Sequence, residues 1–111
     1  MNQRIPSGAK VVVIGGGVAG CSVAYHLAKY GWNDVVLLER DQLTSGTTWH
    51  AAGLIGQLGA SATLTKIRNH SLNLYKELEN ETELSSGLKQ NGSLTVATTK
   101  GRLDELKRQV T

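Results

Sequence analysis

Two short apolar runs near the start of the chain flank a segment with helical periodicity. The runs are KVVVI (10–14), which glycines terminate, and DVVLLE (34–39). β-Branched and aliphatic runs of this length are typical of strands buried on both faces of a parallel sheet. Gly31 is placed to end a helix as its C′ residue, and the apolar positions before it recur at helical spacing: Val18, Cys21, Ala24, Leu27 and Ala28. The pattern predicts a βαβ unit with a right-handed crossover.

The chain after this unit begins with a long segment that lacks periodicity. Residues 40–62 are rich in Gly, Thr, Ser and Ala, and loops of this length in compact domains are usually functional or disordered. Residues 63–80 are predicted to form a helix with one apolar stripe, made of Leu64, Ile67, Leu74, Tyr75 and Leu78. A turn region (85–92) precedes SLTVAT (93–98), which alternates like a half-buried strand. A short amphipathic helix is expected over 102–109.

Composition and charge limit the classes of partner. The chain has 111 residues and a net charge of +3, with a pI of about 9.2, but its basic residues are scattered. We therefore expect no nucleic-acid partner and no membrane-surface patch. No stretch reaches the roughly 18 apolar residues of a membrane span, and MNQRIPSGAK lacks the apolar core of a signal peptide. These features favour a cytoplasmic protein over one of the mitochondrial matrix, and they leave the oligomeric state open.

The residues suited to nucleophilic or metal chemistry are few and scattered. Cys21 is the single cysteine, so no intrachain disulfide can form, and its apolar helical neighbours favour a buried structural thiol. His26 and His70 are expected to be partly exposed helix residues. We predict no metal site.

Gly15, Gly17 and Gly20 form the pattern GxGxxG between the first predicted strand and the predicted helix. This context gives weight to a motif that is weak on its own in a glycine-rich chain. The first glycine permits a tight turn, the second lets a pyrophosphate reach the backbone, and the third allows the helix to pack close to the strand. The helix amino terminus, at Val18 and Ala19, would then offer N–H groups and its positive dipole end to the diphosphate.

Glu39 ends the second predicted strand, nineteen residues after Gly20. A carboxylate at that position can accept hydrogen bonds from both ribose hydroxyls of an adenosine, and it would repel a 2′-phosphate, which disfavours NADP. The alternative is a solvated charge at the strand end. For the adjacent Arg40, a phosphate contact and a solvated side chain are both open.

The small-residue loop after Glu39 carries a single histidine. Its backbone N–H groups, with the hydroxyls of Ser45, Thr47 and Thr48, suit the far half of a long cofactor. The residues alone leave two roles open for His50, a hydrogen-bonded loop histidine or an attachment point, and two for Trp49, stacking on a ring or filling a core. The candidate cofactor-binding residues of the loop are Ser45, Gly46, Thr47, Thr48, Trp49, His50, Ala51, Ala52, Gly53 and Leu54.

Several segments together resemble one flavoprotein family. Four segments are similar to the amino-terminal FAD domain of the dimethylglycine and sarcosine dehydrogenases, within the D-amino-acid-oxidase-like superfamily. These segments are GGGVAGCSVAYHLAKYG, DVVLLERDQLTSGTTWHAAGL, LYKELENET and GSLTVATTKGRLDELKR. The likeness covers nearly the whole chain from Lys10, and TWHAAG is more specific than GxGxxG. It implies FAD as the cofactor and a covalent bond between His50 and the 8α-methyl group of the flavin. The residues alone indicate only an adenine dinucleotide.

The resemblance also implies a fold class and a domain organisation. We expect an α/β protein with a Rossmann-like FAD/NAD(P)-binding βαβ unit, as a truncated amino-terminal fragment of a larger FAD-binding domain. The expected parts are a tail (1–9), an FAD-binding segment (10–84) and the incomplete start of a substrate domain (85–111). Members of the family are several times longer, and many carry a folate-binding domain, so tetrahydrofolate would bind in a part that is absent here. Such a fragment is expected to fold marginally and to aggregate in isolation.

The implied activity is oxidation of the CH–N bond of an N-methylglycine, sarcosine or dimethylglycine, by hydride transfer to flavin. The implied partner is thus a small-molecule amine substrate, and the catalytic residues are expected outside this chain. Two alternatives stay open. One is another amine or amino-acid oxidase of the same superfamily, and the other is a non-catalytic FAD-binding regulatory homologue.

Overall fold

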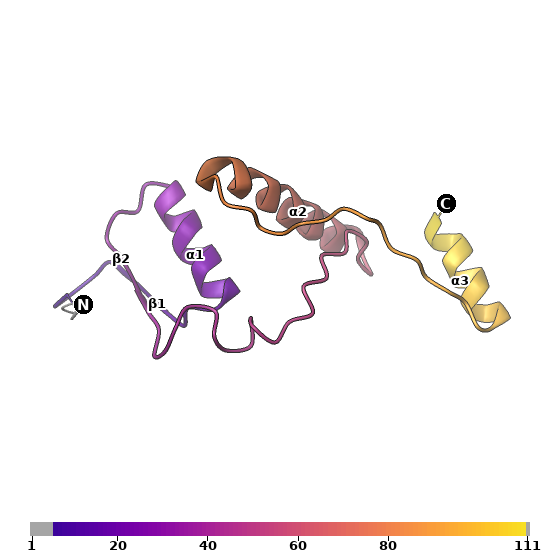
Figure 1. Cartoon of the computed structure of the whole chain (residues 1–111), viewed down its shortest axis with the longest axis horizontal. Helices are drawn as coiled ribbons and strands as arrows, with labels where there is room; N and C mark the ends of the chain where they lie inside the picture. The colour runs from indigo at the N-terminus through magenta and orange to yellow at the C-terminus, as the bar shows by residue number, and fades with distance from the viewer. Residues whose placement is uncertain (1–5, 111) are drawn as a thin grey trace. The chain divides into compact units, whose positions relative to one another are not determined.

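The computed structural model describes residues 6–110, in which five elements follow one another in the order β1, α1, β2, α2 and α3 (Figure 1). The chain divides into two compact units, Met1–Leu54 and Ile55–Thr111. The first unit contains β1, α1 and β2, and the second contains α2 and α3. Part of the predicted tail (residues 1–5) and the last residue of the predicted segment 85–111 lie outside the described residues.

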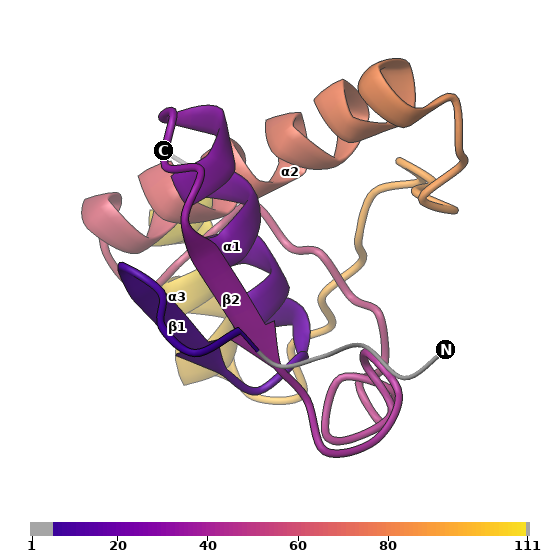
Figure 2. The same ribbon diagram turned by 90° about the vertical axis from the view of Figure 1, so that its left-hand side faces the viewer.

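The first unit is the βαβ unit that the hydrophobic pattern predicts. Strand β1 (Val11–Ile14) pairs in parallel with β2 (Val35–Leu38), and helix α1 (Val18–Lys29) connects them. Each strand is four residues long and leaves out the charged residues at the ends of the two runs, Lys10, Asp34 and Glu39. Figure 2 shows α1 lying along one face of the two strands. The parallel arrangement is therefore confirmed.

The two faces of this sheet differ, and the expectation of burial on both is wrong for the described residues. Val13 faces α1, since a β-carbon built on Gly20 of the helix would lie 3.4 Å from Val13 Cγ1. Side chains alternate along a strand, so Val12 and Ile14 point to the opposite face, where they are 49% and 85% exposed. One crossover helix covers one face, and within this first unit no other described helix or strand packs on the second face.

Gly31 ends α1 as the pattern predicts. Its φ of +85° is in the left-handed region that favours glycine. The Gly31 N–H donates to the carbonyl of Ala28 at 2.9 Å, and the Trp32 N–H donates to the carbonyl of Leu27 at 3.0 Å. These two bonds are the Schellman pattern, in which carbonyls of the last turn gain donors and the chain turns toward β2.

The second unit begins with α2 (Ala62–Thr82), which extends slightly beyond the predicted 63–80 at both ends. Ser61 caps its amino terminus, with its hydroxyl accepting a hydrogen bond from the Leu64 N–H at 3.3 Å. At its carboxyl end the Glu79 carboxylate accepts bonds from the Ser86 N–H at 2.7 Å and the Ser86 hydroxyl at 2.8 Å. The predicted helix is confirmed.

Between α2 and α3, residues 83–99 form neither helix nor strand. The strand predicted over 93–98 is therefore wrong, and Leu94 and Val96 are 91% and 75% exposed. A strand is stabilised by ladder bonds to a neighbour, and no described segment pairs with this one. Alternation of apolar and polar residues shows that a segment is suited to a strand, but a strand also requires a neighbouring strand to pair with.

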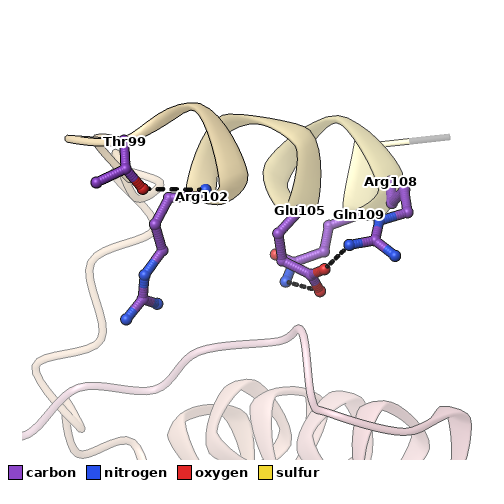
Figure 3. Close-up of polar contacts among 5 residues, drawn as sticks. All are labelled: Thr99, Arg102, Glu105, Arg108 and Gln109. Carbon is purple, nitrogen blue, oxygen red and sulfur yellow. Dashed lines mark hydrogen bonds and ion pairs between the residues drawn. The ribbon is translucent and has the colours of Figure 1, made fainter.

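Helix α3 (Lys100–Val110) contains the amphipathic helix that was expected over 102–109. The Thr99 hydroxyl accepts a hydrogen bond from the Arg102 N–H at 3.3 Å and so caps the first turn (Figure 3). Glu105 and Arg108 form an ion pair at 2.6 Å on the exposed surface. The helix is thus supported by its own cap and its own surface contacts.

Little apolar surface is buried within residues 6–110. Leu72 of α2, 4% exposed, is the one buried hydrophobic residue of this part of the chain, although it is not a member of the predicted stripe. Stripe members Leu64 and Ile67 are 43% and 56% exposed. Helix α2 has the length of a membrane span, but neither it nor any other described helix is apolar enough to cross a bilayer.

Candidate functional site

The turn from β1 into α1 carries the GxGxxG motif, and the first glycine has the conformation that its predicted role requires. Gly15 has a φ of +104°, which L side chains rarely adopt. Its N–H continues the parallel ladder by donating to the carbonyl of Leu38 at 2.8 Å. The chain therefore leaves the sheet abruptly at Gly15.

Gly20 lies in the first turn of α1, against the backbone of the preceding loop. A β-carbon at this position would overlap the Gly15 carbonyl oxygen and would lie 3.0 Å from the Gly15 carbonyl carbon. The neighbour is backbone, so it cannot turn aside as a flexible side chain does. The prediction that Gly20 permits close packing of helix and strand is confirmed.

The Gly16 peptide is held on both sides by groups from outside the motif. Its N–H donates to Glu39 Oε2 at 2.6 Å, and its carbonyl accepts from the Thr44 N–H at 2.9 Å. The Cys21 thiol also lies 3.4 Å from this carbonyl, and it is only partly buried, where a buried thiol was expected. Gly16 is buried, and a β-carbon there would lie 2.5 Å from Leu43 Cδ2.

Sequence reasoning missed Gly16, because GxGxxG leaves that position unspecified. The signal that could have found it is the run of three glycines at 15–17. A third consecutive glycine costs backbone entropy, so it calls for a steric reason. The close approach of the 39–44 segment supplies that reason.

Glu39 follows β2 and reaches back across the glycine turn. Besides the Gly16 N–H, its carboxylate accepts a bond from the Asp41 N–H at 3.1 Å. The Gly16 N–H foremost, and then the Asp41 N–H, lower the pKa of the Glu39 carboxyl below its ordinary value of 4.5, because both bonds favour the charged form. A carboxylate has about four acceptor sites, so Glu39 keeps capacity for ribose hydroxyls. The reading of Glu39 as a merely solvated charge does not match these contacts.

The amino end of α1 presents both occupied and free donors. The Val18 N–H donates to the hydroxyl of Thr48 at 2.9 Å, so this donor is occupied within the described residues. The N–H groups of Ala19 and Gly20 have no acceptor within residues 6–110. Gly17 is the N-cap, and its lack of a side chain leaves room for Thr48, whose oxygen would lie 3.1 Å from a β-carbon there.

The loop that carries the predicted flavin contacts folds into successive turns. Thr44 has a φ of +65°, and its carbonyl accepts the Trp49 N–H at 3.1 Å. The Ser45 hydroxyl donates to the carbonyl of Gln42 at 2.8 Å. These local bonds order residues 42–51 without helix or strand, as the composition predicts.

His50 is exposed at the end of these turns, and one of its ring nitrogens has a partner. Nδ1 lies 2.9 Å from the carbonyl oxygen of Gly46. A carbonyl only accepts, so this bond requires the proton on Nδ1. In the neutral ring Nε2 then carries a free lone pair.

The other loop candidates are mostly exposed. Trp49 and Leu54 are 79% and 89% exposed, so the alternative in which Trp49 fills a core is wrong for this part of the chain. Arg40 is exposed beside Glu39. The structure brings the glycine turn, Glu39, Thr44 and Thr48 together, and it leaves these candidates exposed: Arg40, Ser45, Gly46, Thr47, Trp49, His50, Ala51, Ala52, Gly53 and Leu54.

The chemistry of this arrangement suits an adenine dinucleotide. Two unpaired N–H groups at a helix amino terminus attract a diphosphate, and a carboxylate at the end of the adjacent strand accepts from a ribose. Within the described residues, no group of three His, Cys, Asp or Glu side chains is placed to hold a metal ion. The donors and acceptors present therefore match an organic phosphate ligand.

Comparison with known proteins extends this reading. The model of a family described as FAD dependent oxidoreductase matches residues 10–111. Over 108 residues the chain is 53% identical to sarcosine dehydrogenase, mitochondrial, of Homo sapiens, which covers 96% of this chain. Over 103 residues it is 52% identical to dimethylglycine dehydrogenase, mitochondrial, of Rattus norvegicus, which covers 93% of this chain.

A third relative is named as a regulatory subunit and not as a dehydrogenase. The chain is 45% identical over 104 residues, 94% of its length, to pyruvate dehydrogenase phosphatase regulatory subunit, mitochondrial, of Mus musculus. The chain spans 12% of the length of each of these three relatives.

Proposed function

The chain belongs to the FAD dependent oxidoreductase family, and we propose that residues 10–84 are the amino-terminal part of a Rossmann-like FAD-binding domain. In this proposal the Ala19 and Gly20 N–H groups hold the diphosphate, and Glu39 holds the adenosine ribose. The observation that carries it is the bond between Glu39 and the Gly16 N–H, because it joins the ribose acceptor to the phosphate-binding turn. Residues 85–111 would begin the substrate domain.

The reaction we propose for the whole protein is oxidation of an N-methylglycine, sarcosine or dimethylglycine. Two close relatives bear the names of enzymes for these substrates. When bound, FAD accepts a hydride from the carbon next to the substrate nitrogen. This chain contributes binding and orientation, and the groups that contact the amine belong to the remainder of the protein, as does any tetrahydrofolate site.

His50 is the residue we propose for covalent attachment. Its Nδ1–H bond to Gly46 leaves the Nε2 lone pair available as the nucleophile. Attachment would join Nε2 to the 8α carbon in exchange for one methyl C–H bond and the imidazole Nδ1–H bond. FAD itself would take up the two electrons and two protons that are released.

A pair of histidine variants of the full-length protein tests both cofactor and attachment. The parent protein should be yellow, and the colour should stay with the protein after acid precipitation. His50→Ala should bind FAD but release it in acid, while His70→Ala, on an exposed position of α2, should behave as the parent does. A colourless parent, or one that binds NAD instead, would overturn the proposal.

The substrate is tested by anaerobic addition of amines to the coloured protein. Sarcosine or dimethylglycine should bleach the flavin absorbance. Bleaching by other amines alone would support a different oxidase of the same superfamily. Bound colour that no amine bleaches would support a regulatory homologue, the second candidate, which the resemblance to the phosphatase regulatory subunit favours.

The cellular compartment is also a proposal. The cytoplasm is the location expected in the sequence analysis, whereas the names of all three relatives include the word mitochondrial. Fractionation of cells that express the full-length protein distinguishes the two locations.

A further inference from the structure

Within the proposed function, two of the places where FAD contacts this chain differ in chemistry, the helix end at Ala19 and Gly20 and the histidine at position 50. We propose that Thr48 is a positioning residue that links His50 to the helix end. Its hydroxyl holds the histidine loop on the first turn of α1, so that binding of the diphosphate also places His50 beside the flavin. This inference rests on the proposed FAD site.

The contact between Thr48 and the helix combines a hydrogen bond, partial burial of Thr48 and a space left by a glycine. The hydroxyl accepts the Val18 N–H at 2.9 Å, which satisfies one of the donors left open at a helix start. Thr48 is half-buried, whereas all its neighbours from 41 to 47 and from 49 to 54 are exposed. Gly17 leaves the space that the hydroxyl enters, since a β-carbon there would lie 3.1 Å from Thr48 Oγ1.

Thr48 and His50 belong to one set of turns, so a displacement of one is transmitted to the other. The Ala51 N–H donates to the Thr48 carbonyl at 3.2 Å, and the His50 N–H donates to the Thr47 carbonyl at 3.1 Å. The ring of His50 is bonded in turn to the Gly46 carbonyl. Anchoring Thr48 therefore restricts where the imidazole can lie.

The loop has another anchor, but it is made by backbone alone. The Thr44 N–H donates to the Gly16 carbonyl at 2.9 Å, and substitution of a side chain does not remove that bond. Of the two anchors, the Thr48 hydroxyl is thus the one that a side-chain change can delete. Thr48→Val keeps the branched shape without the acceptor, and Thr48→Ser keeps the acceptor without the methyl group.

The test uses full-length apo-protein, produced under riboflavin limitation, to which FAD is added. We expect Thr48→Val to slow the formation of acid-stable flavin roughly three- to tenfold, the range that loss of one ordinary hydrogen bond allows. Thr48→Ser should restore the parent rate. Thr63→Val, an exposed position of α2, is the matched control and should leave the rate unchanged.

Two further measurements separate positioning from direct contact with the cofactor. In a His50→Ala background, where FAD binds without a bond, Thr48→Val should weaken FAD affinity by a smaller factor than it slows attachment. In the apo-protein, amide hydrogen exchange at Val18 should become faster in Thr48→Val and stay slow in Thr48→Ser.

The possible results lead to distinct conclusions. Equal attachment rates in the parent and Thr48→Val overturn the inference while leaving the proposed function intact. Equal losses of affinity and rate assign Thr48 to direct FAD contact and overturn the positioning role. Failure of Thr48→Ser to restore the rate shows that the methyl group matters instead of the hydroxyl. A parent that never forms acid-stable flavin overturns the attachment at His50 itself.

Discussion

Gly20→Ala is the change that the geometry of the glycine turn makes most informative. Gly20 is a helical residue, and alanine is preferred over glycine in helices by about 1 kcal/mol. Propensity alone therefore predicts a more stable α1. The structure predicts the opposite, because the added β-carbon would overlap the Gly15 carbonyl oxygen and would lie 3.0 Å from its carbon.

The cost can be sized from the nature of the neighbours. Overpacking a close contact costs about 1–3 kcal/mol, and the upper end applies because the Gly15 neighbour is backbone. Relief requires the turn and the start of α1 to separate, which displaces the N–H groups of Ala19 and Gly20 proposed to bind the diphosphate. A cost of about 3 kcal/mol corresponds to roughly 100-fold weaker FAD binding.

The assay is FAD affinity of the full-length protein, followed by flavin fluorescence in a His50→Ala background so that a covalent bond cannot mask weaker binding. Gly101→Ala is the matched control. Gly101 is also helical, in α3, but an added β-carbon there meets nothing within 4 Å. Gly101→Ala should leave affinity unchanged. If Gly20→Ala bound FAD as tightly as Gly101→Ala, the steric account of the cradle would be refuted.

Two other predictions concern the stability of the protein at low pH and the behaviour of the 111-residue chain expressed alone. The pKa of the Glu39 carboxyl is lowered in the folded state, so its bond to the Gly16 N–H stabilises the fold fully above the ordinary pKa of 4.5. This stabilisation is lost as the pH falls through the lower, folded-state pKa. Glu39→Gln should therefore reduce the loss of thermal stability below pH 4.5, and a melting profile like that of the parent would contradict the assignment. The 111-residue chain expressed alone should aggregate, measured by light scattering and size exclusion, because large side chains such as Ile14, Leu54 and Leu94 are 85%, 89% and 91% exposed. A soluble monomer with a cooperative melting transition would show that the exposed surface is tolerated.

The errors of sequence-based prediction fall where an element depends on a distant partner. The segment 93–98 has the alternation of a strand, but no described strand lies beside it to complete a ladder. The apolar runs 10–14 and 34–39 predict two buried faces, while α1 covers only one. Leu72 is buried although it is outside the stripe chosen by periodicity. A local pattern indicates which secondary structure a segment is suited to, whereas the burial of its side chains depends on which other elements pack against it.

The sequence by itself determined the βαβ unit, the steric roles of Gly15 and Gly20, the end of α1 at Gly31 and the long irregular loop after β2. Each of these depends on neighbours within a few residues or on a short crossover, so periodicity and glycine chemistry suffice. Only the tertiary structure decided that Glu39 holds the Gly16 peptide and that Thr48 occupies the Val18 N–H. Those contacts join residues more than twenty positions apart, and no local pattern specifies which donor such a side chain will meet once the chain has turned back on itself.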